Sequence, residues 1–125
     1  MHSAIIILSS LAIIPTLSIS QEIVFSEAKC TIVYSLQRSA DKYFNNEIKQ
    51  LSMQINKKNM RFIDLNNWGK NFPHMKVSGR SRNQLRQHYA LNNGVNQAVL
   101  VNKQGEILSR YSGSVTLVNA LIDCH

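Results

Sequence analysis

Two cysteines, Cys30 and Cys124, are the side chains in this sequence best suited to covalent chemistry. A thiolate attacks disulfides and other electrophiles, and two thiols can close a disulfide in an oxidising compartment. Cys124 stands next to His125, but these residues and Cys30 make only three metal ligands, without a zinc-type spacing. His74 or His88 could activate a cysteine, yet nothing in the sequence orients such a pair. We therefore predict no metal site and no cofactor, and the cysteines remain candidates for a disulfide or a reactive thiol.

The other chemically distinctive feature is an excess of bases between residues 57 and 86. The chain carries 14 Lys and Arg residues against 7 Asp and Glu residues, a net charge of +7, and this segment contains a single acid, Asp64. Its bases are Lys57, Lys58, Arg61, Lys70, Lys76, Arg80, Arg82 and Arg86. Such an excess favours an acidic protein or a polyanion as a partner, although a solvated basic face has the same composition.

Within this segment, "VSGRSRNQLR" is the best candidate for an anion site. Arg80 and Arg82 stand where a helix is expected to begin, and free backbone N–H groups there can help to hold an anion. Trp68, close to Lys70, could stack on a nucleobase or a sugar, or simply cover the core. No specific nucleic-acid motif is present. The predicted anion- or partner-binding residues are Lys70, Lys76, Arg80, Arg82, Arg86 and Trp68.

The remaining sequence offers little to catalysis. It has no phosphate-binding glycine-rich loop, no paired carboxylates and no nucleophile–base motif. Only 7 acids are spread along the chain, so general acid–base catalysis has few candidates. We predict no catalytic residue and lean toward a protein that is not an enzyme.

The first 20 residues have the character of a secretory signal. Residues 4–20 contain no charge and are rich in Ile and Leu, and they end in the small residues Ser18 and Ser20. This pattern predicts a signal peptide at 1–20, cleaved near Ser20, and a single domain at 21–125 in the periplasm or outside the cell. An uncleaved membrane anchor is the alternative, but the run is short for a span and contains Pro15. We expect no membrane anchor after cleavage.

Hydrophobic periodicity places the expected elements. Short apolar or alternating runs predict strands at 30–36, 60–65, 98–101 and 106–113, and apolar residues three or four apart predict helices at 37–59, 81–91 and 114–124. Ser39, Ser81 and Ser114 are the expected N-caps. The last helix should bury four apolar side chains, Leu117, Val118, Leu121 and Ile122.

The order β-α-β-α-β-β-α restricts the topology. A right-handed crossover makes the first two strands parallel neighbours, and the turn "NKQGE" makes the last two strands a hairpin. The continuous apolar strands should be central and the polar ones should lie at the edges. We therefore predict an α/β fold with a four-stranded mixed sheet in order 2-1-3-4 and helices on both faces.

From about Cys30 to Asp123, this arrangement, with "YALNNGVNQAVLVNKQGEI" leading into the hairpin, resembles the thioredoxin fold. More narrowly, it resembles a thioredoxin-like family of unknown function, the DUDES domain of short bacterial secreted proteins and animal sushi-repeat and equarin-type proteins. The residues that carry this narrower resemblance are "TIVYSLQRSADKYFNNEIKQL", "LVNKQGEIL" and "LID".

The sequence departs from the thioredoxin pattern where that pattern carries chemistry. Thioredoxins have Cys-x-x-Cys, and peroxiredoxins one cysteine, where the first strand meets the first helix. The corresponding stretch here is "SLQRSADK", and Gln97 stands where thioredoxins have a cis-proline. Ser39 could replace the thiol, but a serine without a base is a poor nucleophile. The resemblance therefore implies a domain that lacks the redox cysteines.

The topology suggests a use for both cysteines. The final helix should end beside the start of the first strand, so we predict a Cys30–Cys124 disulfide in an oxidising compartment. Our main functional expectation is a redox-inactive, thioredoxin-like binding module that meets an acidic partner through its basic face. The alternative is a thiol-dependent oxidoreductase or peroxiredoxin-like enzyme that uses Cys30 or Cys124.

Overall fold

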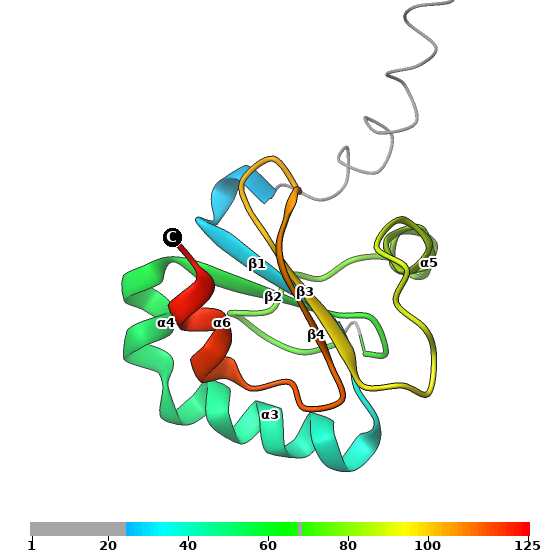
Figure 1. Ribbon diagram of the computed structural model, residues 1–125, viewed down its shortest axis with the longest axis horizontal. Helices are drawn as coiled ribbons and strands as arrows, with labels where there is room; N and C mark the ends of the chain where they lie inside the picture. Colours follow the sequence, from blue (N-terminus) through cyan, green and yellow to red (C-terminus); the bar gives the residue numbers. More distant parts are fainter. Residues whose placement is uncertain (1–24, 68) are drawn as a thin grey trace, which may run out of the picture.

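A single mixed sheet with helices on both faces forms the protein, as the ribbon of the computed structural model shows (Figure 1). The structure describes residues 25–67 and 69–125; the predicted signal peptide and Trp68 lie outside them. The strands are β1 (Cys30–Ser35), β2 (Met60–Asp64), β3 (Gln97–Val101) and β4 (Ile107–Ser112), in order β2-β1-β3-β4. β1 pairs in parallel with β2 and antiparallel with β3, which pairs antiparallel with β4. The predicted α/β fold and sheet order are confirmed.

The central strand β1 and the two edge strands, β2 and β4, differ in burial. All six residues of β1 are buried, as expected for a central strand. No residue of β4 is fully buried, which fits an edge. β2 lies at the other edge, as expected, but it was expected to be less buried, and four of its five residues are buried. The reason is that the segment after it returns along its outer side, where the N–H of Phe62 donates to the Pro73 carbonyl (3.2 Å) and the N–H of Met75 donates to the Phe62 carbonyl (2.7 Å).

The helices divide the core into two layers. Helices α3 (Arg38–Gln50), α4 (Ser52–Lys58) and α6 (Leu117–Asp123) cover one face of the sheet, and α5 (Gly79–His88) covers the other, together with the 3₁₀ turn η1 (Phe25–Glu27). The predicted helix 37–59 is broken at Leu51, where the backbone leaves helical geometry. Ile48 of α3 and Ile55 of α4, seven residues apart, pack in the same core.

The helix starts differ from those predicted. α3 follows Gln37 and α6 follows Thr116, so neither Ser39 nor Ser114 is an N-cap. α5 begins earlier than expected, because the side chain of Ser78 accepts a hydrogen bond from the N–H of Ser81 (3.2 Å). Ser81, the expected cap, is itself buried inside the helix.

Helix α6 also exposes side chains that the periodicity assigned to the core. Leu117 and Leu121 are buried, but Val118 is 50% exposed and Ile122 is 67% exposed. A short helix at the margin of a layer buries a narrower stripe than one packed on both sides. Within residues 25–67 and 69–125, no helix has the length and hydropathy needed to cross a membrane.

Candidate functional site

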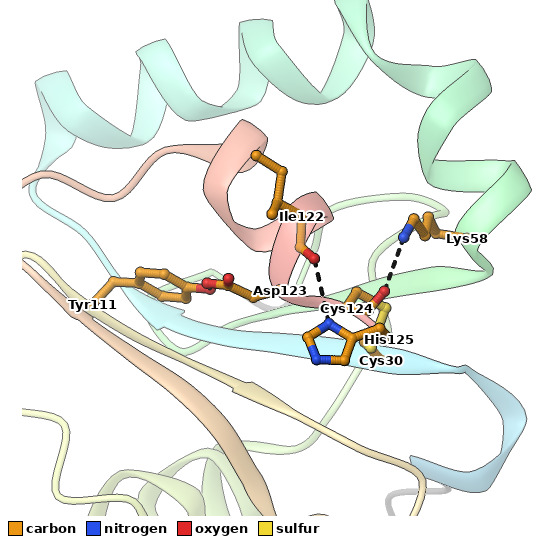
Figure 2. Close-up of a disulfide and its surroundings, with 7 residues drawn as sticks. All are labelled: Cys30, Lys58, Tyr111, Ile122, Asp123, Cys124 and His125. Carbon is orange, nitrogen blue, oxygen red and sulfur yellow. Dashed lines mark hydrogen bonds between the residues drawn. A yellow bond between two sulfur atoms is a disulfide. The ribbon is translucent and has the colours of Figure 1, made fainter.

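The disulfide expected from the sequence is present and joins the start of β1 to the residue after α6. Cys30 and Cys124 are 94 residues apart in sequence, and their Cα atoms are 6.0 Å apart. Strand β1 lies in the middle of the sheet and α6 packs across its start, so the fold itself brings the two residues together (Figures 1 and 2). Both cysteines are fully buried.

Figure 2 shows how the chain is held on either side of Cys124. The ammonium of Lys58, from α4, donates to the Cys124 carbonyl oxygen (2.9 Å). The Tyr111 hydroxyl, from β4, donates to the Asp123 carboxylate (2.6 Å), and burial followed by this hydrogen bond raises the pKa of Tyr111 to about 12. His125 is exposed. The residue after Cys124 therefore faces solvent although the sulfur does not.

An apolar groove runs between α4 and α6 and reaches the same end of the molecule. Its volume is about 330 Å³, and its lining residues are Leu51, Gln54, Lys58, Val118, Leu121 and Ile122. Two of these, Val118 and Ile122, are the exposed side chains of α6. Because Lys58 lines the groove and also binds Cys124, groove and disulfide are neighbours. The periodicity of α6 had assigned these side chains to the core, so sequence reasoning missed the groove.

The opposite end of β1 is where a thioredoxin carries its cysteines, and here polar side chains fill it. The Ser35 hydroxyl accepts a hydrogen bond from Nη1 of Arg86 (3.0 Å), and Nη2 of Arg86 donates to Oδ1 of Asn66 (2.8 Å). Burial, and next the charge of Arg82, lower the pKa of Arg86. This end can hold and orient groups, but it has no thiol to exchange.

The predicted anion-binding residues do not form one cluster. Arg82 and Arg86 both donate to the Leu65 carbonyl on the α5 side of the sheet (3.4 and 3.3 Å), and Arg80 and Lys76 are exposed. Lys70 lies on the α3 side, in ion pairs with Asp41 and Asp64 described below. Trp68 lies outside the described residues. The anion site therefore stays a prediction, as does an acidic protein or polyanion as partner.

Sequence reasoning missed a buried ionic network around Lys70. Its Nζ lies 2.7 Å from Oδ1 of Asp41 and 2.6 Å from Oδ2 of Asp64, and it also donates to the Tyr34 hydroxyl (3.4 Å). The Tyr34 hydroxyl is 2.7 Å from Nε2 of His74. Lysine can only donate, so the hydroxyl hydrogen of Tyr34 goes to His74, whose ring proton is then on Nδ1. The available signal was Asp64, an acid at the end of an apolar strand.

The network shifts the titration of its two aromatic members. Burial, with the charges of Asp64 and Asp41, raises the pKa of Tyr34 far above its usual value. Burial and then the charge of Lys70 lower the pKa of His74 to about 4. Tyr34 is therefore protonated and His74 neutral at physiological pH, which suits the hydrogen bond between them.

Comparison with solved structures identifies the fold. The structure of StoA from Bacillus subtilis covers 79% of this chain and 84% of its own, with a TM-score of 0.55 and 14% sequence identity. The N-terminal domain of PilB from Neisseria gonorrhoeae covers 81% of this chain and 78% of its own, with a TM-score of 0.53 and 13% identity. No protein-family model matches the sequence, and no curated protein is similar to it.

These findings correct two expectations. The narrower resemblance to the DUDES domain is not supported, because no family model matches. The prediction that the domain lacks redox cysteines is also wrong, and with it the main reading as a redox-inactive binding module. The prediction assigned redox chemistry only to cysteines placed where β1 meets α3 and took the predicted Cys30–Cys124 disulfide, at the other end of β1, as structural. The chain has the thioredoxin-like fold and a disulfide on it that can accept two electrons.

Proposed function

We propose that this protein is a thiol–disulfide oxidoreductase of the thioredoxin-like fold, with Cys30 and Cys124 as its redox couple. The observation that carries the proposal is the disulfide between the central strand and α6, next to an open apolar groove. An extended polypeptide can place an apolar side chain in such a groove while its own cysteine lies close to the disulfide. The substrate class is therefore a protein dithiol or disulfide.

The exchange proceeds in two steps. A partner thiolate attacks Sγ of Cys124, the Cys30–Cys124 bond breaks, and its electron pair passes to Sγ of Cys30, which takes up a proton. A second thiolate of the partner then attacks the partner sulfur that is bonded to Cys124. The mixed disulfide breaks, and Cys124 leaves as a thiolate and takes up a proton. The partner dithiol is oxidised to a disulfide and the two cysteines are reduced, and the reverse reaction reduces a partner disulfide.

Cys124 is the sulfur that a partner reaches first. It follows α6 and precedes the exposed His125, whereas Cys30 lies within the buried central strand. The Lys58 ammonium donates to the Cys124 carbonyl oxygen and holds the segment after α6 in place. Because both cysteines are fully buried, the segment after α6 must open before the attack. That opening breaks the Lys58 hydrogen bond and the bond from the Cys124 N–H to the Ala120 carbonyl (3.0 Å).

An extracytoplasmic location suits this activity. The uncharged apolar stretch at residues 4–20 favours export through a signal peptide cleaved near Ser20. A disulfide persists in the periplasm or outside the cell, where thiols are not kept reduced. We place residues 21–125 there as a single domain.

The direct test is the reduction of insulin by dithiothreitol, followed by the turbidity of the released chain. We expect the oxidised protein at catalytic concentration to accelerate this reaction. The variant Cys124→Ser should abolish the acceleration. Cys30→Ser should also be inactive, but its free Cys124 should form a mixed disulfide with a thiol-reactive peptide. Ser39→Ala, an exposed position next to the usual thioredoxin site, is the matched control and should keep full activity.

A structural disulfide would give the opposite result. In that case the native protein would leave insulin reduction at its uncatalysed rate, and dithiothreitol would reduce Cys30–Cys124 only after urea unfolds the chain. Alkylation and mass measurement of native protein distinguish these outcomes without any variant. Circular dichroism of both serine variants shows whether lost activity reflects a lost fold.

A further inference from the structure

We propose that the pocket between α3 and residues 69–74 binds a small molecule with an aromatic body and a carboxylate. The pocket has a volume of about 650 Å³, within the range of about 300–1,000 Å³ typical of ligand sites. It shares no lining residue with the groove beside the disulfide. The inference is therefore independent of the redox function.

The apolar part of the pocket suits a flat ring. Ile48 of α3 contributes to one wall, and Phe72, Pro73 and His74 line the pocket from the facing segment. Phe72 is 68% exposed, so its ring is open to contact with a ligand. The guanidinium of Arg61 lies 4.5 Å from the centre of this ring and holds it by a cation–π contact.

His74, which lines the pocket, is held in place by its neighbours and carries no charge. His74 lies 5.4 Å from Phe62 between ring centres, and it accepts the hydrogen bond from Tyr34. Burial keeps His74 neutral at physiological pH, since its pKa is lowered to about 4. A neutral, hydrogen-bonded imidazole can lie against an aromatic ligand without the desolvation cost of a buried cation.

The two lysines that line the pocket have different roles. Lys70 has three N–H donors, and all three are used by Asp41, Asp64 and Tyr34, so it has none left for a ligand. Lys49 is exposed and makes no ion pair among the described residues. Its ammonium is therefore the group that can meet an acidic substituent, whereas Lys70 holds the wall in place.

The test is titration of the oxidised, ¹⁵N-labelled protein with indole-3-acetate and with its uncharged counterpart, indole-3-acetamide. We expect saturable amide shifts confined to residues 45–52 and 69–74. The acid should bind about threefold to fivefold more tightly than the amide, the gain that an exposed ion pair supplies. Lys49→Gln should remove this difference, and Phe72→Ala should weaken both probes. Lys57→Gln, an exposed lysine of α4 outside the pocket, is the control and should leave both affinities unchanged.

Three results would overturn the proposal. The first is the absence of saturable shifts with either probe at about 10 mM, where even a weak specific site is occupied. The second is equal affinity for acid and amide in the unsubstituted protein. The third is a set of shifts centred on α6 and α4 instead, which would assign the probe to the groove. Unchanged amide spectra of the free variants ensure that each comparison concerns a folded protein.

Discussion

Strand β1 is joined to α6 by a disulfide at its first residue, whereas buried ionic and polar side chains hold it at its last two residues. Cys30 bonds to Cys124 at the first end. At the other end, Tyr34 contacts Lys70 and His74, and Ser35 contacts Arg86. One strand thus carries a redox-sensitive link at its start and pH-sensitive links at its end.

The difference between the two ends bears on how a thioredoxin-like fold can change its chemistry. The fold usually exposes thiols where β1 meets α3, and in this chain Ser35, Asn66 and Arg86 use that space for hydrogen bonds. The disulfide instead lies beneath α6, beside an apolar groove. Reduction should therefore loosen the α6 end and leave the polar end unchanged, and the following predictions test this separation.

The largest effect should come from loss of the disulfide. The Cys30→Ala/Cys124→Ala variant releases a cross-link that spans 94 residues of sequence. Chain entropy for such a loop predicts a loss of about 4–5 kcal/mol in the free energy of unfolding, if the native state is unstrained. Urea unfolding followed by circular dichroism measures it, with dithiothreitol-treated wild type as the matched sample. A loss below about 1 kcal/mol would mean that the disulfide adds little to the fold.

Removal of Lys70 should have the next largest effect. Lys70→Met leaves Asp64, whose side chain is 2% exposed, without its ion-pair partner. Breaking a buried pair in this way costs about 3 kcal/mol, because one charge stays buried and uncompensated. Urea unfolding should show this loss, whereas Lys76→Met, an exposed lysine of the same segment, should change stability by less than about 0.5 kcal/mol. If Lys70→Met and Asp64→Asn/Lys70→Met unfold alike, the buried charge is not the cause.

The sequence predicted the disulfide end of β1 better than the polar end. The apolar run from Cys30 to Leu36 and the crossover rule were enough to place the strand at the centre and Cys124 beside it. These inferences depend on periodicity and chain direction, which are local properties. The groove was not predicted. A helical period of 3.6 identifies the apolar positions in α6, but it does not indicate whether another element covers Val118 and Ile122, which are exposed.

The polar end depends on contacts between residues far apart in sequence. Lys70 reaches Asp41 and Tyr34 across 29 and 36 residues, from a segment that the sequence marked only as a loop. A loop has no periodicity from which side-chain direction can be inferred. The same segment covers β2, which explains why an apparently polar edge strand is buried. The same limit explains why the sequence grouped Lys70 with Arg86, although Lys70 lies on the α3 side of the sheet and Arg86 on the α5 side.

Acid should weaken the polar end before the disulfide end. The pKa of His74 is about 4 in the folded protein against an ordinary value of 6.5, so its contribution to stability is present above pH 6.5 and is lost as the pH falls toward 4. Allowing for partial exposure, we expect a loss of about 2 kcal/mol over this range. Urea midpoints at several pH values measure it. His74→Gln should flatten the profile, whereas His88→Gln, at an exposed position, should keep it. A profile that His74→Gln leaves unchanged would assign the acid sensitivity to other groups.

The smallest effect should come from Ser35. Ser35→Ala removes the hydroxyl that accepts from Arg86 (3.0 Å) and Asn66 (3.4 Å), both of which keep other partners. The expected loss is about 1 kcal/mol, the net worth of one such hydrogen bond, and Ser39→Ala, nearby and exposed, should cost less than about 0.5 kcal/mol. The more informative measurement is the insulin assay. If thiol exchange takes place at the Cys30 end, Ser35→Ala should change stability without changing the exchange rate at a temperature where both proteins are folded. A fall in rate with unchanged stability would instead mean that the polar end of β1 contributes to the exchange.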